Sequence, residues 1–251
     1  VLFMQGGFNL GVDFKGGRSY VVEFNQAVPT DKVKEALADD FGGKGVEVKT
    51  FNGPTKLKVT TSYLVEDESI TANNTVRTAL ETGLKQFSSQ APKVVSESKV
   101  GATVADDILT QSFVSIFYAL IAIFIYILIR FRKWQYSLGG IVALVHDTLV
   151  VLGALVIVRL FGFELEIDQV FIAAVLTVIG YSINDTVIVF DRIREYLGIY
   201  TNKSTDEVLN MAINSTFSRT LITSLTTLFV VLILLLFGGG AIKGFAFAML
   251  V

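Results

Sequence analysis

The sequence predicts a polytopic α-helical membrane protein with a small α+β domain, and three observations lead to this fold class. Hydrophobic residues make up 52% of the 251 residues and charged residues only 18%, with a mean hydropathy of +0.59. Long stretches of the C-terminal half are almost free of ionisable residues, whereas the N-terminal half alternates short apolar strands with amphipathic helices. We therefore expect an α+β domain with a linker over residues 1–110 and a membrane domain over residues 111–251.

Strand and helix patterns alternate in the N-terminal half in the order βαββαβ. GVDFKGGRSYVVEF predicts a strand that bends at Gly16-Gly17 and then continues. TDKVKEALADDF predicts a helix with Thr30 as its N-cap, and VEVKTF and KLKVTTSY predict two strands joined by the turn residues NGP. TANNTVRTALETGLKQF predicts a second helix, because its apolar residues recur with helical spacing, and KVVSESKV predicts a fourth strand. This order favours a ferredoxin-like domain, with another α+β module of the same size as the alternative.

Four stretches of the C-terminal half are long and apolar enough to cross a membrane, which takes about 20 residues. They are residues 112–129, 137–158, 169–190 and 220–242, here the first to fourth spans. Their only ionisable residues are His146 and Asp147 in the second span and Asp185 in the third. A fifth span is expected to begin near Gly244 and to be truncated at Val251, which indicates part of a longer membrane protein.

Charges in the short loops predict the orientation of the spans, because cytoplasmic loops have an excess of Lys and Arg. The loops after the first and third spans are basic, and the loop between the second and third is acidic. The loop after the first span contains Arg130, Arg132 and Lys133, and the loop after the third contains Arg192, Arg194 and Lys203. The loop between the second and third spans contains Glu164, Glu166 and Asp168. We therefore expect the basic loops in the cytoplasm and residues 1 to about 110 outside it. Ser204 and Glu207 predict a capping box at the start of a helix near the membrane surface.

Asp185 is the main candidate functional residue, since an ionised side chain in hydrocarbon is costly and is therefore usually functional. At about 100° per residue, the polar residues around Asp185 fall within an arc of roughly 120° on the helix. This stripe consists of Thr177, Tyr181, Asn184, Asp185, Asp191 and Arg192. The alternative is a stripe that only packs helices through hydrogen bonds, but Thr, Tyr and Asn would do so without a carboxylate.

Arg219, at the start of the fourth span, is the predicted partner of Asp185. It shares one face of its helix with Thr223, Thr226 and Thr227, and both stripes lie toward the same end of the membrane. An Asp185–Arg219 ion pair would offset part of the cost of burying each charge. The alternative is that Arg219 extends its side chain to the membrane surface as an anchor.

His146 and Asp147 are a second pair of candidates. Adjacent residues on a helix do not face each other, so we expect only one of them to face a given neighbour. Asp147 shares its face with the small residues Gly140, Ala143 and Ala154, which permit close approach of another helix. We expect Asp147 to face that helix, as a packing or relay group, and His146 to donate a structural hydrogen bond.

Composition and motifs exclude several classes of function. The sequence has no Cys, which excludes disulfides and thiolate metal sites, and its single His argues against a His-based metal site. The net charge of −2 gives no indication of nucleic-acid binding. Aspartates on neighbouring spans raise the alternative of an intramembrane aspartyl protease, but neither VHDTL nor GYSIND contains a GxGD-type motif. We expect no enzyme activity, no metal and no cofactor.

The membrane segments resemble those of SecF, or of the SecF half of a fused SecDF chain, in the resistance-nodulation-division superfamily. ALVHDTL, VIGYSINDTVIVFDRIRE and RTLITSLTT occur in the family's order, and GVDFKGG and VGATVADDIL resemble segments that precede them. The resemblance implies six membrane helices in this half, with the first absent here and the last incomplete. It also implies that Asp185, Arg219 and Thr223 form a proton relay. Asp147, His146, Asn184 and Tyr181 remain candidates for relay or packing.

The resemblance also implies a function and partners. It implies an accessory subunit of the Sec translocase that uses the proton gradient, or Na⁺, to assist preprotein export through SecYEG. The implied partners are SecD, separate or fused, the SecYEG channel, the motor SecA, the preprotein and membrane lipid, in the bacterial inner membrane. The alternatives are another transporter of the superfamily, moving a small molecule or lipid, and a structural scaffold, which would tolerate Asp185→Asn.

Overall fold

The structure, a computed structural model, describes residues 8–42, 45–67, 69–87, 92–162 and 165–251. It contains two compact units, of which Leu10–Gln111 form one and Ser112–Val251 with Asn9 form the other. The opening stretch VLFMQGG and Glu164 of the predicted acidic loop lie outside the described residues.

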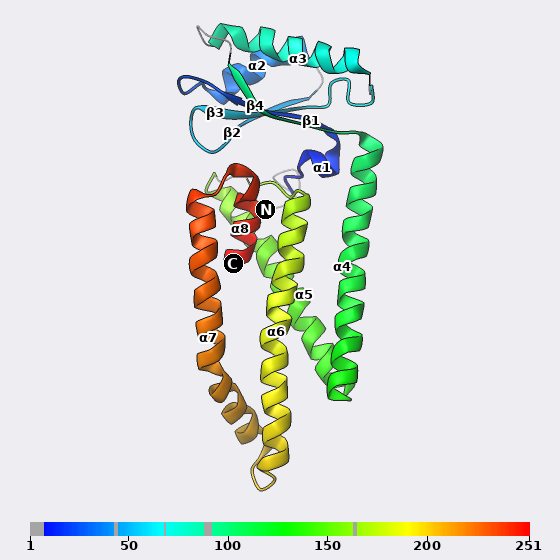
Figure 1. The fold of residues 1–251 in the computed structure, drawn as a ribbon, viewed down its shortest axis with the longest axis vertical. Helices are drawn as coiled ribbons and strands as arrows, with labels where there is room; N and C mark the ends of the chain where they lie inside the picture. The colour runs from blue at the N-terminus through cyan, green and yellow to red at the C-terminus, as the bar shows by residue number, and fades with distance from the viewer. Residues whose placement is uncertain (1–7, 43–44, 68, 88–91, 163–164) are drawn as a thin grey trace. The chain divides into compact units, whose positions relative to one another are not determined.

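The first unit is an antiparallel four-stranded sheet with two helices on one face (Figure 1). The strands are β1 (Gly17–Glu23), β2 (Val46–Thr50), β3 (Lys56–Thr61) and β4 (Lys93–Val100), in the order β2-β3-β1-β4. Helix α2 (Thr30–Asp40) follows β1, and α3 (Ile70–Leu84), with the short 3-10 turn η2 (Lys85–Phe87), follows β3. The predicted βαββαβ order is confirmed, and the strand order is that of a ferredoxin-like fold.

The core of this unit lies between the sheet and the two helices. Tyr20 pairs with Val59 and Val22 with Leu57, so alternate residues of β1 and β3 face the same side. All four are fully buried, and they meet apolar residues of the helices in one cluster. The helical members of this cluster are Val33 and Leu37 of α2 and Val76, Leu80 and Leu84 of α3.

The entry to β1 differs from the sequence prediction. Val12–Lys15 form a short helix, α1, instead of a strand, because the N–H groups of Phe14 and Lys15 both bond to the carbonyl of Gly11 at 3.1 Å. Gly16 (φ +69°) and Gly17 (φ +142°) then turn the chain into β1, with backbone angles that favour glycine. The predicted bend is therefore present, but it separates a helical turn from a strand.

The start of α2 is also corrected. Pro29, with φ −63° and ψ 127°, is the N-cap, and no side-chain hydrogen bond caps the helix. Proline restricts φ to this value, so the extended residue before the helix is Pro29 and Thr30 is already helical. The prediction of Thr30 as N-cap was wrong by one position.

The second unit is helical and contains the membrane spans. Among the described residues, four helices are long and apolar enough to cross a membrane, which agrees with the four predicted spans. They are α4 (Ala102–Phe131), α5 (Trp134–Leu160), α6 (Gln169–Ile199) and α7 (Thr205–Phe237). A shorter helix, α8 (Gly240–Leu250), begins before the predicted Gly244. The predicted linker consists of Gly101 and the first turns of α4.

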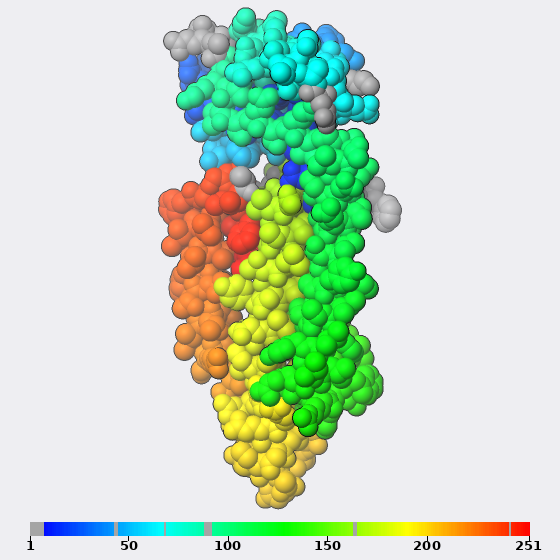
Figure 2. All heavy atoms as spheres, turned by 45° about the vertical axis from the view of Figure 1, so that its right-hand side comes forward, coloured from blue at the N-terminus to red at the C-terminus, as the bar shows by residue number. Residues whose placement is uncertain are grey.

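Helix α6 is central in this unit and α7 is bent. α6 packs against α5, α7 and α8, and Figure 2 shows it as the yellow surface beside α4 (green) and α7 (orange).

The predicted capping box at the start of α7 is present, with Ser204 and Glu207 bonding to each other's backbone N–H. The predicted surface helix and the fourth span are one helix, whose first turns are inclined to the rest (Figure 1). Near the bend, the hydroxyls of Ser215 and Thr216 donate to carbonyls of the preceding turn, a pattern that often bends helices.

Candidate functional site

A hollow of about 390 Å³ lies between α6, α7 and α8, and the two predicted polar stripes both border it. Because α6 and α7 pack side by side, the polar face of each helix is turned toward the same space. The polar lining consists of Tyr181, Ser182, Asn184 and Asp185 from α6 and Thr223, Ser224, Thr226 and Thr227 from α7. Part of each predicted stripe therefore borders the same space.

Asp185 borders the hollow from the middle of α6, where it is partly exposed. Within the described part of the chain it makes no hydrogen bond and no ion pair of 4.0 Å or less. Arg219, which is exposed on α7, is the positively charged residue whose electrostatic attraction acts on the Asp185 carboxylate. The predicted Asp185–Arg219 ion pair is therefore not formed in this structure, and Arg219 does not line the hollow.

Thr223 lies one turn after Arg219 and lines the hollow opposite Asp185. Its hydroxyl donates to the carbonyls of Arg219 and Thr220, each at 2.9 Å. Thr226 likewise donates to the carbonyl of Thr223 at 2.9 Å. These hydroxyls are satisfied by their own helix, so they border the space without binding Asp185.

Asp147 faces α6, as the small residues on its helix face predict. Ser182 Oγ donates to Asp147 Oδ2 at 2.5 Å. At Gly140, on the same face, an added Cβ would lie 2.9 Å from Ile127 Cδ1 of α4, which confirms close helix approach there. His146 Nδ1 lies within hydrogen-bond distance of Asp147 Oδ1, at 3.2 Å, although neighbours on a helix usually point apart. The His146 side chain is 73% exposed, so it has room to bend back toward its neighbour.

Ser182 is a residue that the sequence analysis missed. It borders the hollow of Asp185 and also binds Asp147, so it connects the two carboxylate-bearing helices. A Ser in a helix commonly donates its hydroxyl to a carbonyl of the preceding turn of the same helix. The sequence therefore gave no reason to expect Ser182 to bind a neighbouring helix. Its position three residues before Asp185 was the only available signal.

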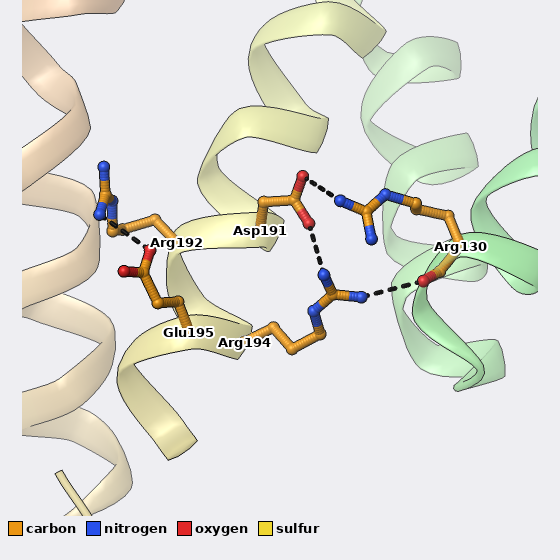
Figure 3. A network of polar contacts seen from close by, with 5 residues as sticks. All are labelled: Arg130, Asp191, Arg192, Arg194 and Glu195. Carbon is orange, nitrogen blue, oxygen red and sulfur yellow. Dashed lines mark hydrogen bonds and ion pairs between the residues drawn. The ribbon is translucent and has the colours of Figure 1, made fainter. Parts of the chain in front are cut away.

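Asp191 and Arg192 do not line this hollow, although they belong to the predicted stripe. Asp191 pairs with Arg130 of α4 at 2.9 Å and with Arg194 at 3.2 Å, and Arg192 pairs with Glu195 at 2.8 Å (Figure 3). The stripe therefore divides into a part that borders the hollow and a part that forms ion pairs near the end of α6.

The hollow is lined by a carboxylate and by groups that can form hydrogen bonds with it. A carboxylate in a membrane span, next to an amide, a phenol and hydroxyls, can take up and release a proton without any covalent step. Among the described residues, no three His, Cys, Asp or Glu side chains gather as a metal site.

Comparison with known proteins identifies the family. Residues 79–251 match the family described as Protein export membrane protein SecD/SecF, C-terminal. The chain belongs to the SecD/SecF family. Residues 1–28 also match the SecD/SecF GG motif. Asp147, Asp185 and Arg219 all lie within the longer match.

Relatives of the SecD/SecF family match nearly the whole chain. The protein translocase subunit SecF of Rhodothermus marinus is 44% identical over 246 residues, which cover 98% of this chain and 77% of the relative. The SecF subunit of Helicobacter pylori strain J99 is 36% identical over 255 residues, covering 100% and 74%. The crystal structure of SecDF from Thermus thermophilus matches with a TM-score of 0.82 at 32% identity, covering 99% of this chain. The chain spans about a third (32%) of that SecDF chain.

Gly16 and Gly17, which lie within the GG-motif match, have a structural reason to be glycine in this chain. An added Cβ at Gly16 would lie 3.1 Å from Ala102 Cα, and one at Gly17 would lie 3.1 Å from the Thr61 carbonyl oxygen. Both glycines also have positive φ. Close backbone approach and backbone conformation therefore both require glycine at these two positions.

Proposed function

We propose that the chain is a proton-driven accessory subunit of the Sec translocase that assists preprotein export through SecYEG. The observation that supports this most is the hollow between α6 and α7, with Asp185 on one wall and Thr223 on the other. Its location in a chain of a protein-export family links a proton site to export. The relatives are named as translocase subunits, which supports a transport role and not that of an enzyme.

The proposed cycle couples protonation to helix movement. When Asp185 is ionised, it attracts Arg219 and the hollow between α6 and α7 closes. Protonation removes that attraction and the two helices separate. One charge that crosses 100 mV supplies about 2.3 kcal/mol, which is the energy available per proton. The coupling ion is H⁺, with Na⁺ as the alternative, and no cofactor is required.

The remaining features of the proposal concern partners and location. The chain acts in the bacterial inner membrane with SecD, separate or fused, and with SecYEG, while SecA acts from the cytoplasm. Residues 1 to about 110 lie outside the cytoplasm in this proposal, and the basic loops after the first and third spans support that orientation. The helix movement is transmitted to that domain, which acts on the translocating preprotein.

Asp185→Asn tests the relay. The full-length protein, with its SecD partner, is placed in inverted membrane vesicles, and export of a reporter is measured with and without a proton uncoupler. The variant should lose the uncoupler-sensitive part of export while remaining inserted. Asp206→Asn is the control, because it makes the same change at an exposed position in the first turn of α7. Uncoupler-sensitive export at the wild-type level in Asp185→Asn would show that Asp185 is a packing group.

A further inference from the structure

A cluster of charged and aromatic side chains joins the end of α4 to α6, here called the Asp191 clamp. Its members are Arg130, Phe131, Tyr136, Phe190, Asp191 and Arg194. Asp191 accepts a hydrogen bond from Arg130 at 2.9 Å and pairs with Arg194 at 3.2 Å (Figure 3). Arg194 also donates to the backbone carbonyl of Arg130 at 3.0 Å. One carboxylate of α6 is thus bound by guanidinium groups of both helices.

Aromatic rings support the same contact. Phe131, at the last position of α4, is only 5% exposed. Its ring centroid lies 5.2 Å from that of Tyr136 and 5.7 Å from that of Phe190. The guanidinium carbons of Arg130 and Arg194 lie 5.7 and 5.4 Å from its centroid, within range of cation–π attraction. Rings and charges therefore hold the α4–α5 turn against the same segment of α6.

The middle of α6 packs against α5, α7 and α8, but among the described residues it has no comparable contact with α4. A second hollow, of about 420 Å³, separates it from α4. Asn184 borders both this hollow and the one that contains Asp185. The segment of α6 that includes the proposed proton site thus runs between two hollows. Asp191, six residues after Asp185, is where the clamp binds α6 to α4.

We propose that Asp191 is a positioning residue for the relay, an inference that rests on the proposed function. By binding Arg130 and Arg194, Asp191 fixes α6 to the α4–α5 turn and keeps Asp185 at a constant place in the membrane. Opening and closing of the Asp185 hollow is then a movement of α7. Asp191 itself neither lines the hollow nor exchanges the transported proton.

Spin-label distances test the clamp in the full-length protein with its SecD partner in liposomes. These 251 residues contain no cysteine, so Lys133→Cys and Leu197→Cys, both exposed, can be labelled to report the distance between the α4–α5 turn and α6. Asp191→Asn should broaden a narrow distance distribution and raise the separated population roughly 3- to 30-fold, as expected for the loss of two partly exposed ion pairs. Arg130→Gln removes only the ion pair between α4 and α6 and keeps the Asp191–Arg194 pair within α6. It should also broaden the distance distribution.

A control and a rescue separate positioning from general damage. Glu195→Gln breaks the neighbouring Arg192–Glu195 pair, which lies within α6, and should leave the distribution narrow. Combining Asp191→Arg with Arg130→Asp again places one carboxylate between two guanidinium groups, and should restore the narrow distribution. In export vesicles, the uncoupler-sensitive export per inserted molecule should fall for Asp191→Asn, stay unchanged for Glu195→Gln and recover in the double variant.

Several outcomes would overturn the inference. A narrow distribution in both Asp191→Asn and Arg130→Gln, or equal broadening in Glu195→Gln, would show that the clamp does not hold α6. A broad distribution with normal uncoupler-sensitive export would show that Asp191 does not position the relay. If the wild-type protein shows no uncoupler-sensitive export, the proposed function fails, and the distances alone decide whether the clamp exists.

Discussion

Replacing Asp147 by Asn tests whether this carboxylate packs helices or exchanges protons. Its Oδ2 accepts a hydrogen bond from Ser182 at 2.5 Å, and its Oδ1 lies 3.2 Å from His146 Nδ1. Asn has almost the same shape as Asp, and its carbonyl oxygen can accept the same bond from Ser182. Asn cannot take up and release a proton at working pH. A packing residue therefore tolerates the change, and a relay residue does not.

The size of the packing effect follows from the hydrogen bond that Asp147 of α5 accepts from Ser182 of α6. Hydrogen bonds between membrane helices contribute about 0.6 kcal/mol on average and up to about 1.7 kcal/mol. Asp147 is 40% exposed, so we expect its bond to lie in the lower part of that range. Ser182→Ala removes the donor and should lower Tm by roughly 1–4 °C, at 2–4 °C per kcal/mol. Asp147→Asn keeps the bond in weaker form and should lower Tm less.

The assay pairs thermal unfolding of the purified protein with export of a reporter from energised vesicles. We expect Asp147→Asn to lose only part of the uncoupler-sensitive export, and no more than Ser182→Ala loses. Thr148→Ala is the control, because the Thr148 hydroxyl donates to Leu144 of its own helix at 2.9 Å and not to α6. Complete loss of uncoupler-sensitive export in Asp147→Asn, with an unchanged Tm, would refute packing and assign Asp147 to the relay.

Two further predictions concern the α+β unit. Burial raises the pKa of Tyr20 above its usual value of 10.0. The protonated phenol therefore stabilises the fold fully below pH 10, and this contribution is lost as the pH rises through the higher pKa of the folded state. Tyr20→Phe should remove this alkaline loss of stability from a circular-dichroism titration, and an identical transition in both proteins would contradict the prediction. Gly17→Ala should lower the free energy of unfolding by about 1–3 kcal/mol, because a Cβ is strained at this backbone conformation. A lower Tm would measure this loss. Gly45→Ala is the control and should leave Tm unchanged, because no atom lies within 4 Å of the added Cβ.

The sequence by itself determined the elements of the fold. A stretch without charges that is long enough to cross a bilayer is a local property, so all four spans could be located before any contact was known. The βαββαβ order and the buried faces of its helices follow from local periodicity in the same way. Asp185 was identifiable because a carboxylate within an apolar span can be read from the sequence alone, and its cost in hydrocarbon makes it a candidate functional residue.

Only the tertiary structure decided which side chains meet. It joined Asp147 to Ser182 and Asp191 to Arg130, it left Asp185 without an ion pair to Arg219, and it placed Asp185 and Thr223 on the lining of one hollow. It also replaced the predicted strand before Gly16 by a helical turn, because backbone hydrogen bonds to Gly11 decide that geometry. In a membrane, lipid tails are as apolar as the helix surfaces, so hydrophobicity specifies that a helix spans but not how it is rotated or shifted against its neighbours. Close packing and single polar contacts set that arrangement, and those contacts join residues that are far apart in the sequence.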